Sequence, residues 1–115
     1  MSHYTELVVE DLLEGSGAVV KKGGALITAH YRGFLEYGRE FDSSHKHGTP
    51  FQTVLSRKKV IAGWVEGLKG MRVGGIRRLK VPAALGYGEY GFKGKIPPNA
   101  DLVFEIELLE VLNRE

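Results

Sequence analysis

The sequence contains no cysteine among its 115 residues, and this absence excludes several kinds of protein. Without cysteine there is no disulfide, no thiolate metal ligand and no cysteine nucleophile, so a secreted scaffold held by disulfides is excluded. No apolar run approaches the roughly eighteen residues that a membrane span requires. The N-terminus, Met1 to Glu6, has no basic segment leading into an apolar one, as a signal peptide would have. We therefore expect a cytoplasmic protein with no membrane partner, although a mature form whose signal had been removed would look the same.

A strong excess of either charge is also missing. Sixteen Lys and Arg residues stand against fourteen Asp and Glu, which gives a formal net charge of +2 at pH 7. The basic residues cluster only in three short runs, which are typical of solvated faces: Lys21-Lys22, Arg57-Lys58-Lys59 and Arg77-Arg78. A nucleic-acid-binding domain more often has a large basic excess with interleaved aromatic residues, so we expect no nucleic-acid partner.

What the chain does have is the composition of one compact domain. Hydrophobic residues make up 43% and charged residues 26% of it, and no internal repeat is present. A chain of this size and balance can bury a real core, so we predict a single domain over residues 1–115 and a monomer.

The run from Lys58 to Leu68 holds the only tryptophan and predicts a short helix. Its apolar residues recur at i, i+3, i+4 and i+7, the spacing of one helical face: Ile61, Trp64, Val65 and Leu68. A lone tryptophan is most often a core residue. The alternative makes its indole the floor of a pocket.

The ends of this helix are predicted from capping residues. Ser56 is the expected N-cap and Gly70 the expected C-terminal cap. Gly63 and Gly67 each cost about 1 kcal/mol relative to alanine in a helix interior, and short helices are marginal in water. Packing by the rest of the chain must therefore hold the helix.

Alternating apolar and polar residues predict strands on both sides of the helix. Tight turns join them, which favours an antiparallel sheet, and one short helix can cover only one face, so the predicted class is α+β. Gly33 marks an expected bulge, and the last strand is expected near the sheet centre. The expected strands cover 7–13, 27–37, 40–42, 50–55, 76–81 and 102–112.

Residues 83–99 form a segment too long and too apolar for an ordinary connection, and such loops in small domains are often functional. Residues 86–91 within it satisfy G-x-G-x-x-G. A dinucleotide site also needs a helix opening at those glycines inside a βαβ unit, and neither is predicted. We interpret the glycines as turn formers.

No combination of residues predicts acid–base, nucleophilic or metal chemistry. His45 and His47 could be half of a metal site, and Asp42 to His45 supply the residue types of a catalytic triad. A metal site needs a third ligand, and neighbours in one loop seldom adopt triad geometry, so we interpret them as solvated loop residues. His30 lies on the polar face of its strand, where solvent or a cross-strand hydrogen bond suffices. We expect no metal and no cofactor.

A set of large apolar and aromatic residues is spread over the strands, helix and loops. Most of these residues could be core, but a long loop folded over the tryptophan would leave a concave aromatic site for a small molecule or peptide. They are Tyr31, Phe41, Phe51, Trp64, Tyr87, Phe92, Ile96 and Phe104.

Seven short motifs resemble a known family in their order and approximate spacing. They are Tyr31-Arg32-Gly33, Phe41-Asp42-Ser43-Ser44, Pro50-Phe51, Val60-Ile61-x-Gly63-Trp64, Tyr87-Gly88, Ile96-Pro97-Pro98 and Leu102-Val103-Phe104. This series resembles the FKBP-type peptidyl-prolyl isomerases, immunophilins that bind tacrolimus and rapamycin, over nearly the whole chain. The resemblance implies a five- to six-stranded antiparallel sheet wrapped around one short α-helix.

The resemblance also assigns site residues. It implies catalytic roles for Tyr31, Phe41, Asp42, Trp64, Tyr87 and Phe104, and substrate-binding roles for Phe51, Val60, Ile61, Phe92 and Ile96. In the family, the backbone N–H matching Ile61 and the hydroxyl matching Tyr87 hydrogen-bond to ligand carbonyls. Three residues depart from common family usage and are expected at the rim: His47, Phe92 and Lys95.

The implied activity is cis–trans isomerisation of X-Pro bonds in proline-containing peptides and unfolded proteins, with tacrolimus and rapamycin as inhibitors. The alternative is a proline-binding or chaperone module with little catalytic activity. Asp42 is expected to position the peptide, to be a buried carboxylate satisfied by donors such as Tyr31, or to do both.

Overall fold

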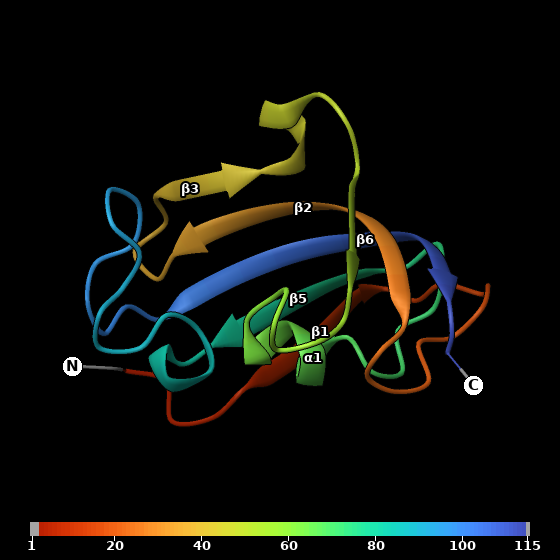
Figure 1. The fold of residues 1–115 in the computed structure, drawn as a ribbon, viewed down its shortest axis with the longest axis horizontal. Coiled ribbons are helices and arrows are strands. Elements are labelled where there is room, and N and C mark those ends of the chain that lie inside the picture. The colour runs from red at the N-terminus through yellow and green to blue at the C-terminus, as the bar shows by residue number, and fades with distance from the viewer. Residues whose placement is uncertain (1–2, 115) are drawn as a thin grey trace.

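A computed structural model describes residues 3–114 as a curved antiparallel sheet with a short helix against one face (Figure 1). Residues 1, 2 and 115 of the predicted domain lie outside the described residues. Among the helices within 3–114, none has the length and apolar character needed to cross a membrane. The strands are β1 (Val8–Leu13), β2 (Leu26–Leu35), β3 (Glu40–Ser43), β4 (Phe51–Val54), β5 (Ile76–Val81) and β6 (Leu102–Leu112); the helices are α1 (Ala62–Gly67), η1 (Ser44–His47) and η2 (Ala83–Leu85).

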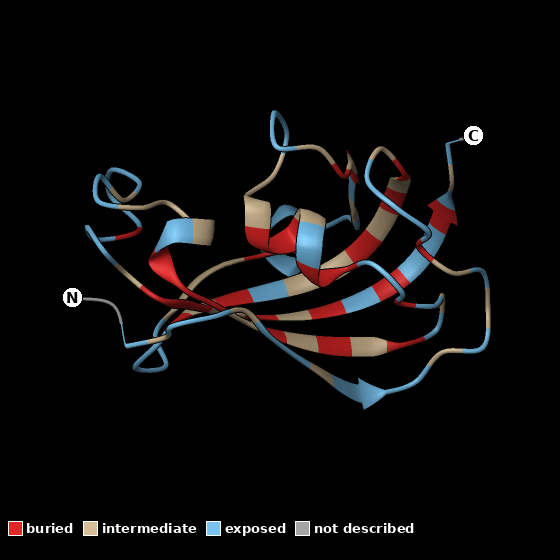
Figure 2. Cartoon of the chain, turned by 90° about the horizontal axis from the view of Figure 1, so that it is seen from below, coloured by how far each residue is buried: buried red, intermediate tan, exposed pale blue. Residues whose placement is uncertain are grey.

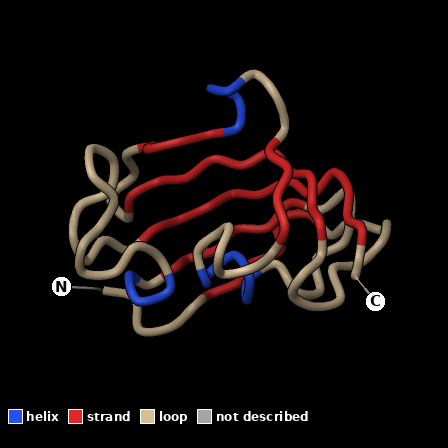
Figure 3. The backbone as a smooth tube through the Cα atoms, in the orientation of Figure 1, coloured by secondary structure: helices blue, strands red, loops and turns tan. Residues whose placement is uncertain are grey.

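The sheet confirms the predicted antiparallel arrangement and the central place of the last strand. Its order is β1-β5-β6-β2-β3, and β4 also pairs with β2. The long strand β2 pairs with β4 through Leu26–Ala29 and with β3 through Arg32–Phe34, so two short strands share one edge. The register of β2 against β3 shifts between Gly33 and Phe34, where the bulge was predicted. Figure 3 follows β3 into η1 and the loop that returns to β4.

The core lies between α1 and the concave face of the sheet. Figure 2 shows α1 over this face, with buried and less buried positions alternating along the strands beneath it. Along β6, the inward side chains Leu102, Phe104, Ile106 and Leu108 are all at most 4% exposed, while Glu105 and Glu107 point outward. This period of two is the alternation that the sequence showed.

The predicted helix boundaries were wrong. The helix begins with Ala62, its N-cap is Ile61 rather than Ser56, and Leu68 rather than Gly70 is its C-cap. The carbonyl of Ser56 accepts hydrogen bonds from the N–H groups of Lys59 and Val60, which closes a separate turn before the helix. Ile61 has an extended backbone, with φ −64° and ψ 154°. The apolar residues at helical spacing therefore include one, Ile61, that lies outside the helix.

Gly63 and Gly67, which weaken the helix locally, are the residues that let it approach the sheet. A Cβ atom on Gly63 would lie 2.6 Å from Val81 Cγ1, and one on Gly67 would lie 2.8 Å from Leu79 Cδ1 and Cδ2. Val81 and Leu79 are fully buried in β5 and cannot swing into solvent. The close contact between helix and sheet therefore requires glycine at both positions.

We predict that Gly63→Ala lowers the free energy of unfolding by about 1 kcal/mol, measured by urea titration. Overpacking costs about 1–3 kcal/mol and exceeds the roughly 1 kcal/mol that alanine gains in helix propensity. In a Val81→Ala background the same substitution should instead stabilise the protein, because the new methyl group enters vacated space. A destabilisation of equal size in both backgrounds would contradict the close approach of Gly63 to Val81.

Candidate active site

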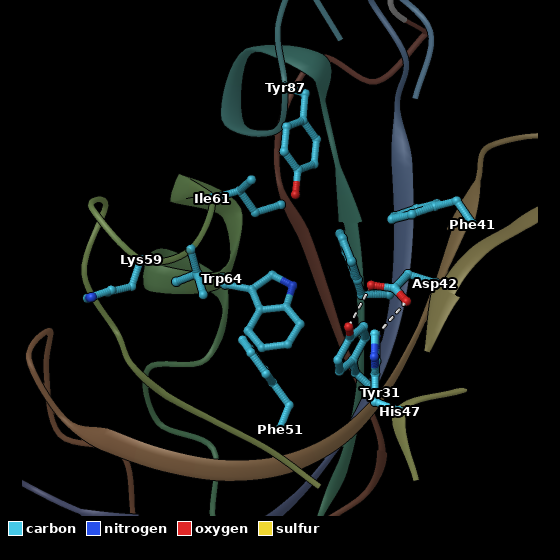
Figure 4. A pocket seen from close by; sticks show the side chains of 11 residues that line it. Tyr31, Phe41, Asp42, His47, Phe51, Lys59, Ile61, Trp64 and Tyr87 are labelled. Atoms are coloured by element: carbon cyan, nitrogen blue, oxygen red, sulfur yellow. Dashed lines mark hydrogen bonds and ion pairs between the residues drawn. The ribbon is translucent and has the colours of Figure 1, made fainter. Parts of the chain in front are cut away.

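A cavity of about 450 Å³ opens above α1, between the β3 side of the sheet and the loop that follows β5 (Figure 4). Its walls come from β2, β3, η1, β4, α1 and β6, and from the segments before α1 and after η2. The lining residues are Tyr31, Phe41, Asp42, His47, Phe51, Lys59, Val60, Ile61, Trp64, Tyr87 and Phe104. The structure thus brings together nine of the eleven residues that the sequence analysis assigned to the site.

The indole of Trp64 lies at the base of this cavity and is also part of the core. Its side chain is buried, at 4% exposure, and three rings meet it edge to face. The ring centroids of Tyr31, Phe51 and Phe104 lie 5.4, 5.9 and 5.6 Å from that of the indole, at interplanar angles of 80°, 80° and 90°. Edge-to-face contacts at these distances are favourable and fix the indole orientation. Both interpretations of the lone tryptophan therefore hold.

Among the described residues that line this cavity, Asp42 is the one acidic residue, and both oxygens of its carboxylate have partners. The Tyr31 hydroxyl donates to Oδ2 at 2.8 Å, and the backbone N–H of Ser43 donates to Oδ1 at 2.9 Å. His47 Nε2 lies 3.3 Å from Oδ1. These contacts confirm Tyr31 as a donor to the carboxylate, as the sequence analysis expected.

The hydrogen bonds outweigh burial in setting the ionisation of Asp42. Burial alone raises the pKa of this carboxyl, but the hydrogen bonds from Tyr31, Ser43 and His47, together with the charge of Lys95, hold the pKa below its usual value of 3.8. Burial, followed by the Asp42 hydrogen bond, strongly raises the pKa of Tyr31. At neutral pH the cavity wall therefore carries an ionised Asp42 and a protonated Tyr31.

The Tyr87 hydroxyl and the backbone N–H of Ile61 are among the hydrogen-bond donors at the cavity that remain available for a ligand. Burial, and then the charge of Asp42, raises the pKa of Tyr87, which keeps its hydroxyl protonated. Figure 4 shows this hydroxyl pointing into the hollow between Ile61 and Trp64, and it forms no hydrogen bond with residues 3–114. Within the same range, the backbone N–H of Ile61 has no hydrogen-bond acceptor, because Ile61 precedes the helix.

Local backbone structure holds Tyr87 over the cavity. The carbonyl of Ala83 in η2 accepts hydrogen bonds from the N–H groups of Gly86 and Gly88. Gly88 has a φ of +61° and Gly91 a φ of +67°, conformations that glycine adopts without strain. The glycines of the G-x-G-x-x-G match therefore form turns, as predicted.

Two residues assigned to substrate binding do not line the cavity. Ile96 is 5% exposed and packs in the core, where its backbone pairs with that of Phe92. Phe92 is 51% exposed, and its ring packs beside Tyr87 with centroids 5.5 Å apart. Their role in substrate binding remains a prediction. Lys59, which the sequence analysis did not assign, does line the cavity; its place directly before Val60-Ile61 was the available signal.

The other polar candidates have structural roles. The ring of His45 stacks on that of His30, with centroids 4.7 Å apart. His30 Nδ1 lies 2.9 Å from Ser44 Oγ, so its partner is in η1 and not on a neighbouring strand, as the cross-strand alternative had expected. Ser43 caps η1 by accepting a hydrogen bond from the Lys46 N–H. The residues Asp42 to His45 therefore do not form a catalytic triad among themselves.

A different group of side chains could approach a metal ion. His3, Glu36 and Asp101 place ligand atoms within 4.8 Å of one another, a grouping hidden in the sequence by their wide separation. Asp101 Oδ2 accepts hydrogen bonds from the N–H groups of His3 and Tyr4, and Oδ1 accepts one from Ala83. Through these hydrogen bonds, the buried carboxylate of Asp101 joins the N-terminal segment to η2, which is a structural role.

Fold and site together define a small α+β domain whose concave face holds an aromatic pocket. Residues 17–109 match the family described as FKBP-type peptidyl-prolyl cis-trans isomerase. The chain is 50% identical over 105 residues to the FK506-binding protein of Neisseria meningitidis serogroup B, covering 91% of this chain and 95% of that one. It is 48% identical over 111 residues to FK506-binding protein 1 of Debaryomyces hansenii, covering 96% and 99%.

Solved structures agree with these sequence matches. The crystal structure of AtFKBP13 superposes with a TM-score of 0.83 at 38% identity, covering 92% of this chain and 93% of that one. The chain belongs to the FKBP-type peptidyl-prolyl cis-trans isomerases.

We predict that Asp42→Asn lowers stability at neutral pH by about 1–2 kcal/mol, because hydrogen bonds to a charged group are replaced by neutral ones. The pKa of Asp42 is lower in the folded than in the unfolded chain. Its ionised form therefore stabilises the protein above the unfolded value near 3.8, and this contribution is lost as the pH falls through the folded-state value. The unfolding free energies of the two proteins should start to approach each other as the pH falls below about 4 and should meet below the folded-state pKa, measured by urea titration across pH. Parallel pH curves would contradict an engaged carboxylate.

Proposed function

We propose that the cavity above Trp64 holds the prolyl ring of an X-Pro peptide and accelerates rotation about the imide bond. The observation that carries this is the pairing of an aromatic cavity with two free donors, the Ile61 N–H and the Tyr87 hydroxyl. A prolyl ring fits an apolar hollow of about 450 Å³, and its two flanking carbonyls need donors. The donors fix the peptide while the ring lies among the aromatic side chains.

The physical basis of the rate increase is the difference in polarity between two states of the imide. Unaided isomerisation takes tens to hundreds of seconds because twisting the bond sacrifices amide resonance. The planar imide is more polarised than the twisted one, so an aromatic wall that excludes water disfavours the planar state more. This is preferential binding of the transition state, and each tenfold in rate requires about 1.4 kcal/mol.

This mechanism needs no proton transfer. Asp42 has a lowered pKa and three hydrogen-bond contacts, so it is a weak base already satisfied by protein donors. Tyr31 and Tyr87 both have raised pKa values and stay protonated. We assign Asp42 and Tyr31 to shaping the wall, Tyr87 and Ile61 to positioning the peptide, and the rings of Phe41, Trp64 and Phe104 to the apolar environment.

Proline-containing peptides and unfolded proteins are the proposed substrates, and tacrolimus and rapamycin the proposed inhibitors. The relatives from N. meningitidis and D. hansenii carry FK506-binding names, and their extensive identity supports macrolide binding here. His47 and Lys59 line the cavity and would contact any ligand that extends past the prolyl ring. A cytoplasmic monomer remains our prediction from sequence.

The decisive test is a protease-coupled assay on a short X-Pro peptide with and without rapamycin. We expect rapid isomerisation that stoichiometric rapamycin abolishes, because drug and prolyl ring compete for one cavity. Undetectable turnover with retained peptide binding would instead favour the proline-binding module. Turnover that rapamycin leaves unchanged would place catalysis away from this cavity.

The role of the free hydroxyl can be tested separately. Tyr87→Phe should lower kcat/KM about 2- to 10-fold, the loss expected from one hydrogen bond of about 0.5–1.5 kcal/mol. Tyr90→Phe is the matched control, because Tyr90 belongs to the same loop but is 86% exposed and does not line the cavity. Equal effects of the two substitutions would show that the Tyr87 hydroxyl does not contact the peptide.

A further inference from the structure

The turn before α1 projects a basic run beside the cavity. Hydrogen bonds from the N–H groups of Lys59 and Val60 to the carbonyl of Ser56 close this turn. Its tip consists of Arg57, Lys58 and Lys59, all exposed. The compact turn therefore places three consecutive cationic residues at one edge of the site and does not spread them along a helix face. From the sequence alone, this run was interpreted as a solvated face.

This basic turn forms one wall of a second hollow that continues from the prolyl cavity. The second hollow has a volume of about 400 Å³ and lies between residues 57–62 on one side and Gly86-Tyr87 on the other. It shares Lys59, Val60, Ile61 and Tyr87 with the first. The shared residues include both free donors, the Ile61 N–H and the Tyr87 hydroxyl. A peptide held by those donors would therefore pass directly from one hollow into the other.

The charge in this second hollow is of one sign. Three basic residues and no acidic residue line it. Arg57 is partly neutralised, because its guanidinium lies 3.2 Å from Glu66 Oε2. Lys58 and Lys59 form no ion pair with any residue between 3 and 114. Figure 4 shows the stem of Lys59 at the cavity wall with its ammonium group directed away from Trp64, toward the outer side.

We propose that this basic hollow, residues 57–62 with Gly86 and Tyr87, is a subsite for an acidic side chain of the substrate, so that the protein prefers X-Pro peptides with Asp or Glu near the proline. The proposal rests on the proposed function, since it takes the prolyl ring to occupy the cavity above Trp64. An extended chain advances about 3.3–3.6 Å per residue, so the acidic residue would lie within about three positions of the proline, on the side that leaves past Ile61 and Tyr87.

The prolyl cavity holds one opposing charge, the ionised Asp42, on which the charge of Lys95 also acts. Its only carboxylate, Asp42, is already contacted by Tyr31, Ser43 and His47, so it has little left to offer a substrate cation. Lys58 and Lys59 are the cations without an ion-pair partner among the described residues that line the second hollow. Because they are exposed, each contact contributes modestly and is screened by salt.

The test uses peptides with one central Pro and a single Glu, Gln or Lys placed one to three positions before or after it, with isomerisation followed by NMR exchange spectroscopy. On one side of the proline, we expect kcat/KM to be about 3- to 10-fold higher for Glu than for Lys peptides at low salt. The preference should fall as ionic strength rises, and Lys58→Gln/Lys59→Gln should abolish it.

The matched control is Lys21→Gln/Lys22→Gln, which removes the same net charge from an exposed run that lines neither hollow. This control should retain the Glu preference. Equal turnover of Glu and Lys peptides, a preference that survives Lys58→Gln/Lys59→Gln, or an equal loss in the control would each overturn the subsite. Failure of the proposed function is distinguishable, because then no peptide of the series would be turned over.

Discussion

The close packing of α1 against the concave face of the sheet is the contact on which the site depends. Gly63 and Gly67 let the helix backbone approach Val81 and Leu79, and this depth sets the height of Trp64 above β6. The indole is then met edge to face by rings from β2, β4 and β6. A helix held farther from the sheet would separate the indole from those rings and leave the cavity without a fixed floor. The glycines that weaken the isolated helix are thus required by the tertiary structure.

The division of one sheet edge between β3 and β4 opens the cavity. The two strands pair with opposite halves of β2, so the chain between them must leave the sheet through η1 and return. Phe41 and Asp42, before this detour, and Phe51, after it, lie on different sides of Trp64 in the cavity (Figure 4). A single continuous edge strand would bring these residues side by side. The bulge at Gly33 belongs to the same arrangement, because a Cβ there would lie 2.7 Å from the ring of Phe41.

The sequence predicted the strands and the helix whose residues alternate in burial. It did not predict helix ends and loop conformations, which depend on individual backbone hydrogen bonds. The bounds of β5 and β6 follow directly from alternation, since each inward residue packs on the helix side. The start of α1 was placed too early because the spacing of Ile61 and Trp64 is helical while the backbone at Ile61 is extended. In the glycine-rich segment 83–99 no periodicity exists, so the orientations of Phe92 and Ile96 could not be derived. The resemblance assigned both to the pocket, and neither lines it.

In this pocket, the residues proposed to catalyse the isomerisation differ from those proposed to determine which peptides are preferred. An apolar wall favours the twisted imide only if it remains free of unpaired charge, since a free cation or carboxylate in contact with the imide would stabilise the polarised planar state as well. The carboxylate of Asp42 on this wall stays ionised, but hydrogen bonds from the protein already engage both of its oxygens and lower its pKa. Charged side chains that select among substrates must then lie outside the ring of aromatic residues, where they can contact the peptide on either side of the proline. The turn at residues 57–59 satisfies this requirement, because it lies next to the donors that hold the peptide and beyond the rings that surround the proline.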